Sequence, residues 1–282
     1  MRWGAEKRLE FIDFRLYWEG RINRKDITDF FGVSIPQASE DLRKYHEKAP
    51  GNMEYDKRGK FYYAAPRFMP VSTSSDAESY LSQLQMIAMR KGEQNGTVLG
   101  FIPKFDVIHP FARLVDPIIL RELVKAIRAK KALEIEYQSM SRPEPAPRWI
   151  APHALASDGL RWHVRAFCYV HEEFRDFVIG RMTKVLRGKP AETDPSRDVL
   201  WNKYIAVKIG PHPGLTDAQK RSIEKDYGMD NGIAEIRIRA AFYFYLEKRL
   251  GLQAGCEERS GIEQQIVILN REEVAAALAE SK

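Results

Sequence analysis

Side chains that can hydrogen-bond to nucleic-acid bases gather in one short stretch, 31-FGVSIPQASEDLRKYHE-47. Gln37, Ser39 and Arg43 are residue types that recognise base edges in the major groove of DNA, and Ser34 and Lys44 complete the candidate set. At about 100° per residue, one helical face carries Ile35, Ala38, Leu42 and Tyr45, and the other carries Pro36, Gln37, Glu40, Arg43 and Lys44. The pattern predicts a helix that packs through its first face and presents the second.

Local signals fix where this helix begins. Ser34 is a good N-cap, Pro36 falls in the first turn where a missing N–H costs little, and Gln37 completes an S-x-x-Q capping box. Upstream, 24-RKDITDFFG-32 predicts a short helix that ends at Gly32. Two helices joined by a tight glycine turn are typical of a helix-turn-helix.

The flanking segments extend this motif. The stretch 5-AEKRLEFIDFRLYWEG-20 predicts a helix with apolar residues at helical spacing, and 53-MEYDKRGKFYYA-64 predicts two strands and a turn. Two strands after a helix-turn-helix indicate a winged helix. Its tip carries cations suited to phosphate contacts, Lys57, Arg58 and Lys60.

Two features qualify a DNA-binding interpretation. Residues 1–65 hold 13 Lys/Arg against 11 Asp/Glu, a net charge of only +2, and Glu40 lies on the predicted reading face. There it would repel phosphate or accept a hydrogen bond from a cytosine amine. A charged helix face is also commonly a solvated surface, and winged helices also serve as protein-contact modules.

The whole chain limits the other possibilities. Its 282 residues suffice for two or three domains, and it contains no apolar run long enough to span a bilayer and no N-terminal secretory pattern, so we expect a cytoplasmic protein. Cys168 and Cys256 lie far apart without metal-ligand spacing, which favours buried free thiols. We expect no metal, no cofactor and no catalytic residue, because the histidines are scattered and no Walker, H-E-x-x-H or G-x-S-x-G motif occurs.

The sequence pattern divides the chain into four segments and predicts a multidomain α+β fold. Residues 1–65 form the winged helix, and residues 66–119 a linker and helical connector with helices over 77–92 and after 116-DP-117. Residues 120–190 switch to strand-like alternation over 132–138, 161–170 and 174–182, which predicts a small β-barrel. Residues 200–282 form an α+β unit, with strands at 203–210, 233–240 and 264–270 and helices at 216–228, 242–251 and 271–280.

The middle segment concentrates positive charge. Residues 120–190 hold 14 Lys/Arg against 8 Asp/Glu, so this quarter of the chain carries a net charge of +6, equal to that of the whole chain. Its arginines recur on the predicted strands beside aromatic residues, a combination that binds phosphates and stacks on bases. We therefore expect an anionic ligand here.

The middle segment contains, in this order, Tyr137, His153, 161-RWHV-164, 174-FRDF-177 and 181-RM-182. In the order of these residues it resembles the WYL domain, an Sm/SH3-like β-barrel of bacterial transcriptional regulators. The resemblance covers nearly the whole chain, with a winged helix before the barrel and a WCX-like extension behind it. It is strongest, through 34-SIPQASEDL-42, 161-RWHVRAFC-168 and 174-FRDFVIGR-181, to regulators beside phage-defence systems of the BREX and CBASS kinds.

The resemblance implies a homodimeric repressor that binds an inverted-repeat operator, with a nucleotide or nucleic-acid fragment sensed by the barrel. Carried over by position, the implied ligand-binding residues are Tyr137, Ser139, His153, Trp162, Arg165, Arg175 and Arg181. The chain departs from the motif that names the family, because Trp-Tyr-Leu reads Trp162-His163-Val164 here. An alternative function is a nucleic-acid-binding adaptor whose barrel holds single strands while its winged helix contacts protein.

Overall fold

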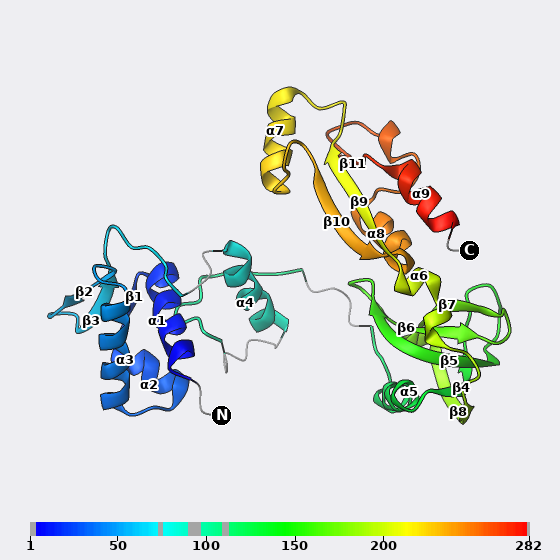
Figure 1. The fold of residues 1–282 in the computed structure, drawn as a ribbon, viewed down its shortest axis with the longest axis horizontal. Helices are drawn as coiled ribbons and strands as arrows, with labels where there is room; N and C mark the ends of the chain where they lie inside the picture. Colours follow the sequence, from blue (N-terminus) through cyan, green and yellow to red (C-terminus); the bar gives the residue numbers. More distant parts are fainter. Residues whose placement is uncertain (1–3, 73–75, 90–96, 109–112, 281–282) are drawn as a thin grey trace. The chain divides into compact units, whose positions relative to one another are not determined.

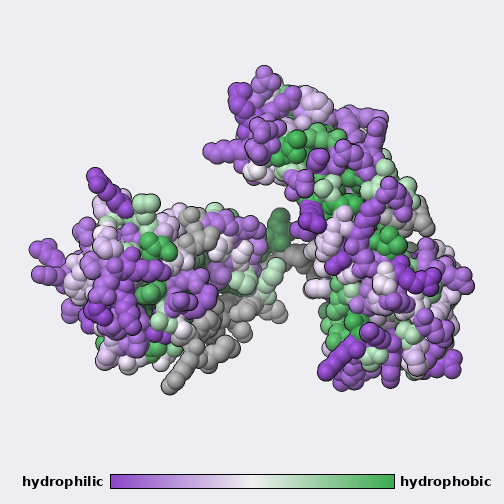
Figure 2. Space-filling view, in the orientation of Figure 1, coloured by the Kyte–Doolittle hydropathy of each residue, from purple (hydrophilic) through white to green (hydrophobic). Residues whose placement is uncertain are grey.

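The computed structural model describes residues 4–72, 76–89, 97–108 and 113–280. The chain forms two compact units, Met1–Pro110 and Phe111–Lys282, shown together in Figure 1 and treated separately below. Figure 2 shows hydrophilic side chains over most of the visible face of both units, with apolar groups scattered among them. Among the described residues, no helix combines the length and apolar character that crossing a bilayer requires.

The first unit contains the predicted winged helix. Helices α1 (Ala5–Glu19), α2 (Arg24–Phe31) and α3 (Ile35–Lys48) pack around a core that includes Ile12, Leu16 and Tyr45, all at most 1 % exposed. Strands β2 (Met53–Asp56) and β3 (Phe61–Ala64) form the predicted wing. A two-residue strand, β1 (Arg21–Ile22), pairs with β3 and completes a sheet of order β1-β3-β2. The sequence pattern missed β1 because two residues are too few to show alternation.

Helix α4 (Ala77–Met89) belongs to the same unit. It lies in the segment that the sequence assigned to a linker and connector, and its Leu84 and Ile87 pack with Phe14 of α1 and with Leu99. Trp18 and Tyr80 border this cluster, with ring centroids 5.0 Å apart. Aromatic side chains on the outer face of α1 therefore bury a second apolar layer beyond the three-helix core.

The second unit begins with α5 (Pro117–Ala129), which Asp116 caps as predicted by accepting a hydrogen bond from the Ile118 N–H at 2.7 Å. A five-stranded antiparallel sheet of order β7-β6-β5-β4-β8 follows, the strand set of the predicted barrel. Its strands are β4 (Lys131–Tyr137), β5 (Ala146–Ser157), β6 (Trp162–Cys168), β7 (Glu173–Val178) and β8 (Met182–Pro190). Helix α5 packs over β4, β5 and β8 through Ile119, Leu123 and Ala126.

Strand β5 contains two prolines, Pro147 and Pro152, and this composition hid it in the sequence, since proline is depleted within sheets. The structure accommodates Pro152 at a register shift. Pro152 pairs with Ala166 and Ala154 pairs with Arg165, which leaves His153 as the extra residue of a bulge. Bulges redirect a side chain out of the regular alternation, and His153 uses this to reach a carboxylate outside the sheet.

The C-terminal part has the predicted α+β order. Strands β9 (Tyr204–Pro211), β10 (Ala234–Arg239) and β11 (Ile266–Ile268) form a sheet of order β10-β9-β11. Helices α7 (Asp217–Asp226), α8 (Tyr243–Leu250) and α9 (Arg271–Ala279) accompany it, and short α6 (Val199–Asn202) leads into β9. The predicted T-x-x-Q capping box forms at Thr216 and Gln219. Val207, Leu252 and Cys256 are fully buried in its core, so Cys256 is the buried free thiol that we expected.

Candidate functional site

The N-terminus of α3 is held by local contacts that differ in part from the predicted box. The Ser34 hydroxyl accepts from the Gln37 N–H at 3.3 Å, as expected of an N-cap. The side chain of Gln37 does not return to the cap. Its amide instead donates to Asp41 at 3.0 Å, and Arg8 of α1 donates to both oxygens of that carboxylate at 2.6 and 3.2 Å. Gln37 is therefore half-buried and tied to the packing between α1 and α3.

The other candidate readers are also engaged within α3. The guanidinium of Arg43 donates to Glu40 at 2.6 and 2.8 Å and to Glu47, and these contacts raise the pKa of Arg43 and lower that of Glu40. The Ser39 hydroxyl donates to the Ile35 carbonyl at 3.0 Å, and Lys44 approaches Glu40 at 3.7 Å. Because exposed ion pairs contribute little free energy, Arg43 and Lys44 can exchange these partners for phosphates or bases.

Our prediction for Ile35 was wrong. It was expected on the packing face, yet its side chain is 63 % exposed, whereas Ala38, Leu42 and Tyr45 of that face are at most 1 % exposed. Ile35 is the first residue of α3, so it lies ahead of the part of the helix that the other elements cover. The wing tip agrees with expectation, since Lys57, Arg58 and Lys60 are all exposed in the turn between β2 and β3.

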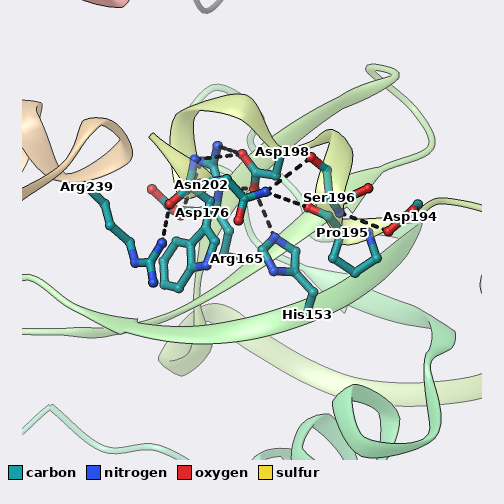
Figure 3. A network of polar contacts seen from close by, with 10 residues as sticks. His153, Arg165, Asp176, Asp194, Pro195, Ser196, Asp198, Asn202 and Arg239 are labelled. Carbon is teal, nitrogen blue, oxygen red and sulfur yellow. Dashed lines mark hydrogen bonds and ion pairs between the residues drawn. The ribbon is translucent and has the colours of Figure 1, made fainter. Parts of the chain in front are cut away.

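In the second unit, two of the predicted ligand residues are instead buried together around one carboxylate. Arg165 donates to both oxygens of Asp198 at 2.8 and 2.9 Å, and the ring nitrogen Nε2 of His153 lies 2.9 Å from the same carboxylate, as Figure 3 shows. The backbone N–H of Trp201 adds a fourth donor at 3.1 Å. Arg165 and Asp198 are 4 % and 1 % exposed.

The electrostatics of this cluster follow from its contacts. Burial by itself would raise the pKa of Asp198, but the hydrogen bonds from Arg165 and His153 outweigh it and bring the pKa to about 2. A second carboxylate, Asp176 of β7, lies 3.4 Å from Arg165 and accepts from the Tyr245 hydroxyl of α8 at 3.1 Å. The cluster therefore joins the barrel to α6 and α8 of the C-terminal part by charge-assisted hydrogen bonds.

A separate pocket of about 400 Å³ opens beside the start of β6. Its lining includes Arg161 and Trp162 of β6 with the turn before it, Arg181 between β7 and β8, and Arg113 and Leu114 ahead of α5. The Trp162 ring is 54 % exposed. Arg161 is paired with Asp158 at 3.2 Å, whereas neither Arg113 nor Arg181 has a carboxylate partner among the described residues. The pocket thus combines uncompensated positive charge with an open aromatic ring.

The predicted ligand residues therefore divide. Trp162 and Arg181 line this pocket, while Arg165 and His153 surround Asp198. Tyr137 is 7 % exposed and its hydroxyl accepts from the Val178 N–H at 3.3 Å. The remaining two are at the surface, since the Ser139 hydroxyl bonds to that of Ser141 at 2.8 Å and Arg175 pairs with Glu173.

The sequence did not identify several residues in or near these two sites. Arg113 precedes α5 and has no motif around it, and the carboxylates Asp176 and Asp198 carry no signal without the cations that they bind. Asp198 lies 33 residues from Arg165 and 45 from His153 in the sequence. Arg148, 7 % exposed, was also missed; its guanidinium lies 5.2 Å from the centre of the Tyr137 ring.

Comparison with known proteins follows the same division of the chain. Residues 4–86 match the BrxR transcriptional regulator winged helix-turn-helix domain, residues 118–186 the WYL domain, and residues 204–274 the BrxR transcriptional regulator C-terminal dimerization domain. A solved structure of proteasome accessory factor B/C (PafBC) of Arthrobacter aurescens aligns with 98 % of this chain and 48 % of its own at 17 % identity, with a TM-score of 0.26.

Relatives that align over nearly the whole chain have a higher sequence identity than this solved structure. The DNA-binding transcriptional repressor CapW of Stenotrophomonas maltophilia is 41 % identical over 285 residues, covering 100 % of this chain and 95 % of that protein. Repressors of the same name from Escherichia coli (strain KTE188) and Pseudomonas aeruginosa are 39 % and 40 % identical and cover 98 % and 97 % of this chain and 93 % and 91 % of their own lengths. The chain, in which a BrxR-type winged helix precedes a WYL domain and a C-terminal dimerization domain, therefore belongs to the family of these CapW proteins.

Proposed function

We propose that this protein is a homodimeric repressor that binds an inverted-repeat DNA operator and lacks catalytic activity. The observation that carries the proposal is the capped helix α3 with its exposed face, next to a wing tip bearing Lys57, Arg58 and Lys60. Full-length relatives named as DNA-binding transcriptional repressors support it. The C-terminal dimerization model over residues 204–274 supports a dimer, which suits two half-sites related by two-fold symmetry.

Work is divided between α3 and the wing in this proposal. Wing cations bind phosphates, which supply affinity without sequence information, and α3 contacts base edges. The candidate α3 set remains Ser34, Gln37, Ser39, Arg43 and Lys44. Gln37 and Arg43 first have to exchange their contacts to Asp41 and to Glu40 and Glu47.

The proposal further assigns ligand sensing to the pocket lined by Arg113, Arg161, Trp162 and Arg181. Uncompensated guanidinium groups suit phosphates, and an open tryptophan ring suits stacking on a base, so the ligand class is a nucleotide or nucleic-acid fragment. Ligand binding changes operator affinity only if the ligand binds the DNA-free and DNA-bound states unequally. Given the resemblance to phage-defence regulators, the regulated genes are a defence operon.

The first test is a fluorescence-anisotropy titration with duplex DNA from upstream of the protein's own gene, a scrambled duplex and a salt series. A repressor binds the upstream duplex much more tightly than the scrambled one, and a steep salt dependence reports phosphate contacts. The adaptor alternative instead predicts affinity for single strands and equal, weak binding to both duplexes. Adding mononucleotides, dinucleotides and short single-stranded oligonucleotides then tests the pocket, with Arg181→Gln as the control.

A further inference from the structure

We propose that Ile35 recognises thymine in the operator by packing against the C5 methyl group in the major groove. The inference rests on the proposed DNA-binding function and adds to it a residue that determines specificity. It starts from an anomaly in the fold: an isoleucine at the first position of α3 is 63 % exposed, on a helix whose other apolar residues Ala38, Leu42 and Tyr45 are covered.

The position of Ile35 decides what its exposure means. Single exposed apolar residues are common on protein surfaces and need no explanation by themselves. In a helix-turn-helix, however, the N-terminal residues of the second helix contact base edges. Ile35 immediately follows the cap residue Ser34, and exposed Pro36 stiffens the same turn. The isoleucine therefore lies where a reading side chain is needed.

The polar side chains around Ile35 are less available. The amide of Gln37 is committed to Asp41, which Arg8 also holds. The guanidinium of Arg43 is shared between Glu40 and Glu47 further along the helix, and the Ser39 hydroxyl donates to the carbonyl of Ile35 itself. Ile35 requires no such exchange of partners, so it can contact a base in the conformation that the free protein already has.

The chemistry names one partner. All four bases present polar groups in the major groove, and thymine alone adds a methyl group to its O4 acceptor. An apolar side chain in the groove leaves those polar groups unsatisfied at the other bases, whereas against thymine it removes two apolar surfaces from water together. Ile35 should therefore discriminate in favour of thymine at one position of each half-site.

Deoxyuridine scanning tests this directly, because replacing thymine by deoxyuridine removes the methyl group and keeps every hydrogen-bonding group. In the duplex from upstream of the gene, each thymine is replaced in turn and the dissociation constants of the wild type, Ile35→Ala and Ile35→Val are compared. At one thymine per half-site the wild type should lose about three- to tenfold in affinity, the effect of one or so buried methyl groups.

The variants distinguish this contact from a general weakening. Ile35→Ala removes the contact from both half-sites of the dimer, so it should bind the unmodified duplex about ten- to a hundredfold more weakly and no longer respond to deoxyuridine at that thymine. Ile35→Val keeps branched methyl groups and should keep the response. Ile118→Ala is the matched control, because Ile118 is 61 % exposed and, like Ile35, lies in the first turn of a helix with a side-chain N-cap and a proline in that turn. It should respond as the wild type does.

Two results would overturn the inference in different ways. If the wild type prefers the upstream duplex but no deoxyuridine effect depends on Ile35, the thymine contact is wrong and the proposed repressor stands. If upstream and scrambled duplexes bind equally, the proposed function fails and Ile35 has no operator to read. Since Ile35 is exposed, Ile35→Ala should melt at the wild-type temperature, which a thermal denaturation curve checks.

Discussion

Removing the carboxylate of Asp198 should destabilise the second unit more than any surface change. Asp198→Ala deletes the acceptor of four donors, the two nitrogens of Arg165 at 2.8 and 2.9 Å, the ring of His153 and the N–H of Trp201. The Arg165 guanidinium stays buried, with Asp176 at 3.4 Å as a weaker partner. Breaking a buried ion pair in this way lowers the free energy of unfolding by about 3–5 kcal/mol. We expect a loss near the lower end of this range, because the contact with Asp176 remains.

The second substitution separates an unpaired charge from a lost contact. Arg165→Met in the Asp198→Ala background removes the stranded guanidinium, so the double variant should be more stable than Asp198→Ala by about 2 kcal/mol, since replacing a whole buried pair by apolar groups is often close to neutral. Glu173→Ala is the matched control. It breaks the exposed pair with Arg175, whose side chains are 52 % and 47 % exposed, and should change stability by less than about 1 kcal/mol.

Unfolding in guanidinium chloride, followed by tryptophan fluorescence, measures these free energies of unfolding. All variants are compared at one fixed protein concentration, because unfolding of a dimer depends on concentration. A free energy of unfolding for Asp198→Ala within about 1 kcal/mol of the wild type would contradict the cost of an unpaired buried charge. Simple addition of the losses from Asp198→Ala and Arg165→Met would contradict it equally, because contacting residues of one ion-pair network should couple.

Three further predictions follow from the same geometry. Lys57→Ala and Arg58→Ala should weaken binding to the upstream and scrambled duplexes alike, and each should lower the salt slope by about 2, or about 1 for each subunit of the dimer, measured by anisotropy; a change in sequence preference would contradict a phosphate role. Trp162→Ala should abolish the response of DNA binding to any effective oligonucleotide while leaving operator affinity intact, which a titration with and without that oligonucleotide shows. Burial holds the pKa of His163 below its ordinary value, so the folded state favours the neutral ring. Stability should therefore fall as pH drops below about 6.5, where the unfolded chain takes up the proton, and His163→Phe should flatten that dependence in melting curves.

The sequence predicted local structure where the signals lay within a few residues of each other. Thr216 and Gln219 form their capping box, and Asp116 and Pro117 begin α5 where expected. The same kind of signal misled at Gln37, because a long-range partner competed: Arg8 positions Asp41, and Asp41 takes the glutamine amide away from the cap. Helical spacing gives the direction of Ile35 around the helix axis, which is that of the packing face. It does not say whether another element covers that end of the helix.

The candidate site in the barrel was predictable only in its charge. Arginines and aromatic residues at 161–181 indicated an anionic ligand, yet the sequence could not show which cations are already neutralised. Arg165 and His153 meet Asp198, which lies outside the predicted barrel, and the bulge that aims His153 sits at a proline that hid the strand. Arg181 has no carboxylate partner among the described residues, and this difference between arginines of one segment depends on contacts remote in sequence.

Residues of strand β6 contact both the proposed pocket and the C-terminal part. Trp162 lines the pocket. His163 is 3 % exposed and lies against the Tyr245 ring of α8, with ring centroids 5.1 Å apart. Arg165 binds Asp198 at the start of α6. Tyr245 also donates to Asp176, whose other oxygen faces Arg165. On the proposed function, a ligand that displaces Trp162 acts on a strand whose next buried residues contact the part of the chain that matches a dimerization domain. Because close-packed contacts of this kind shift together, we propose the dimerization domains as the route by which an anion bound in this pocket changes operator affinity.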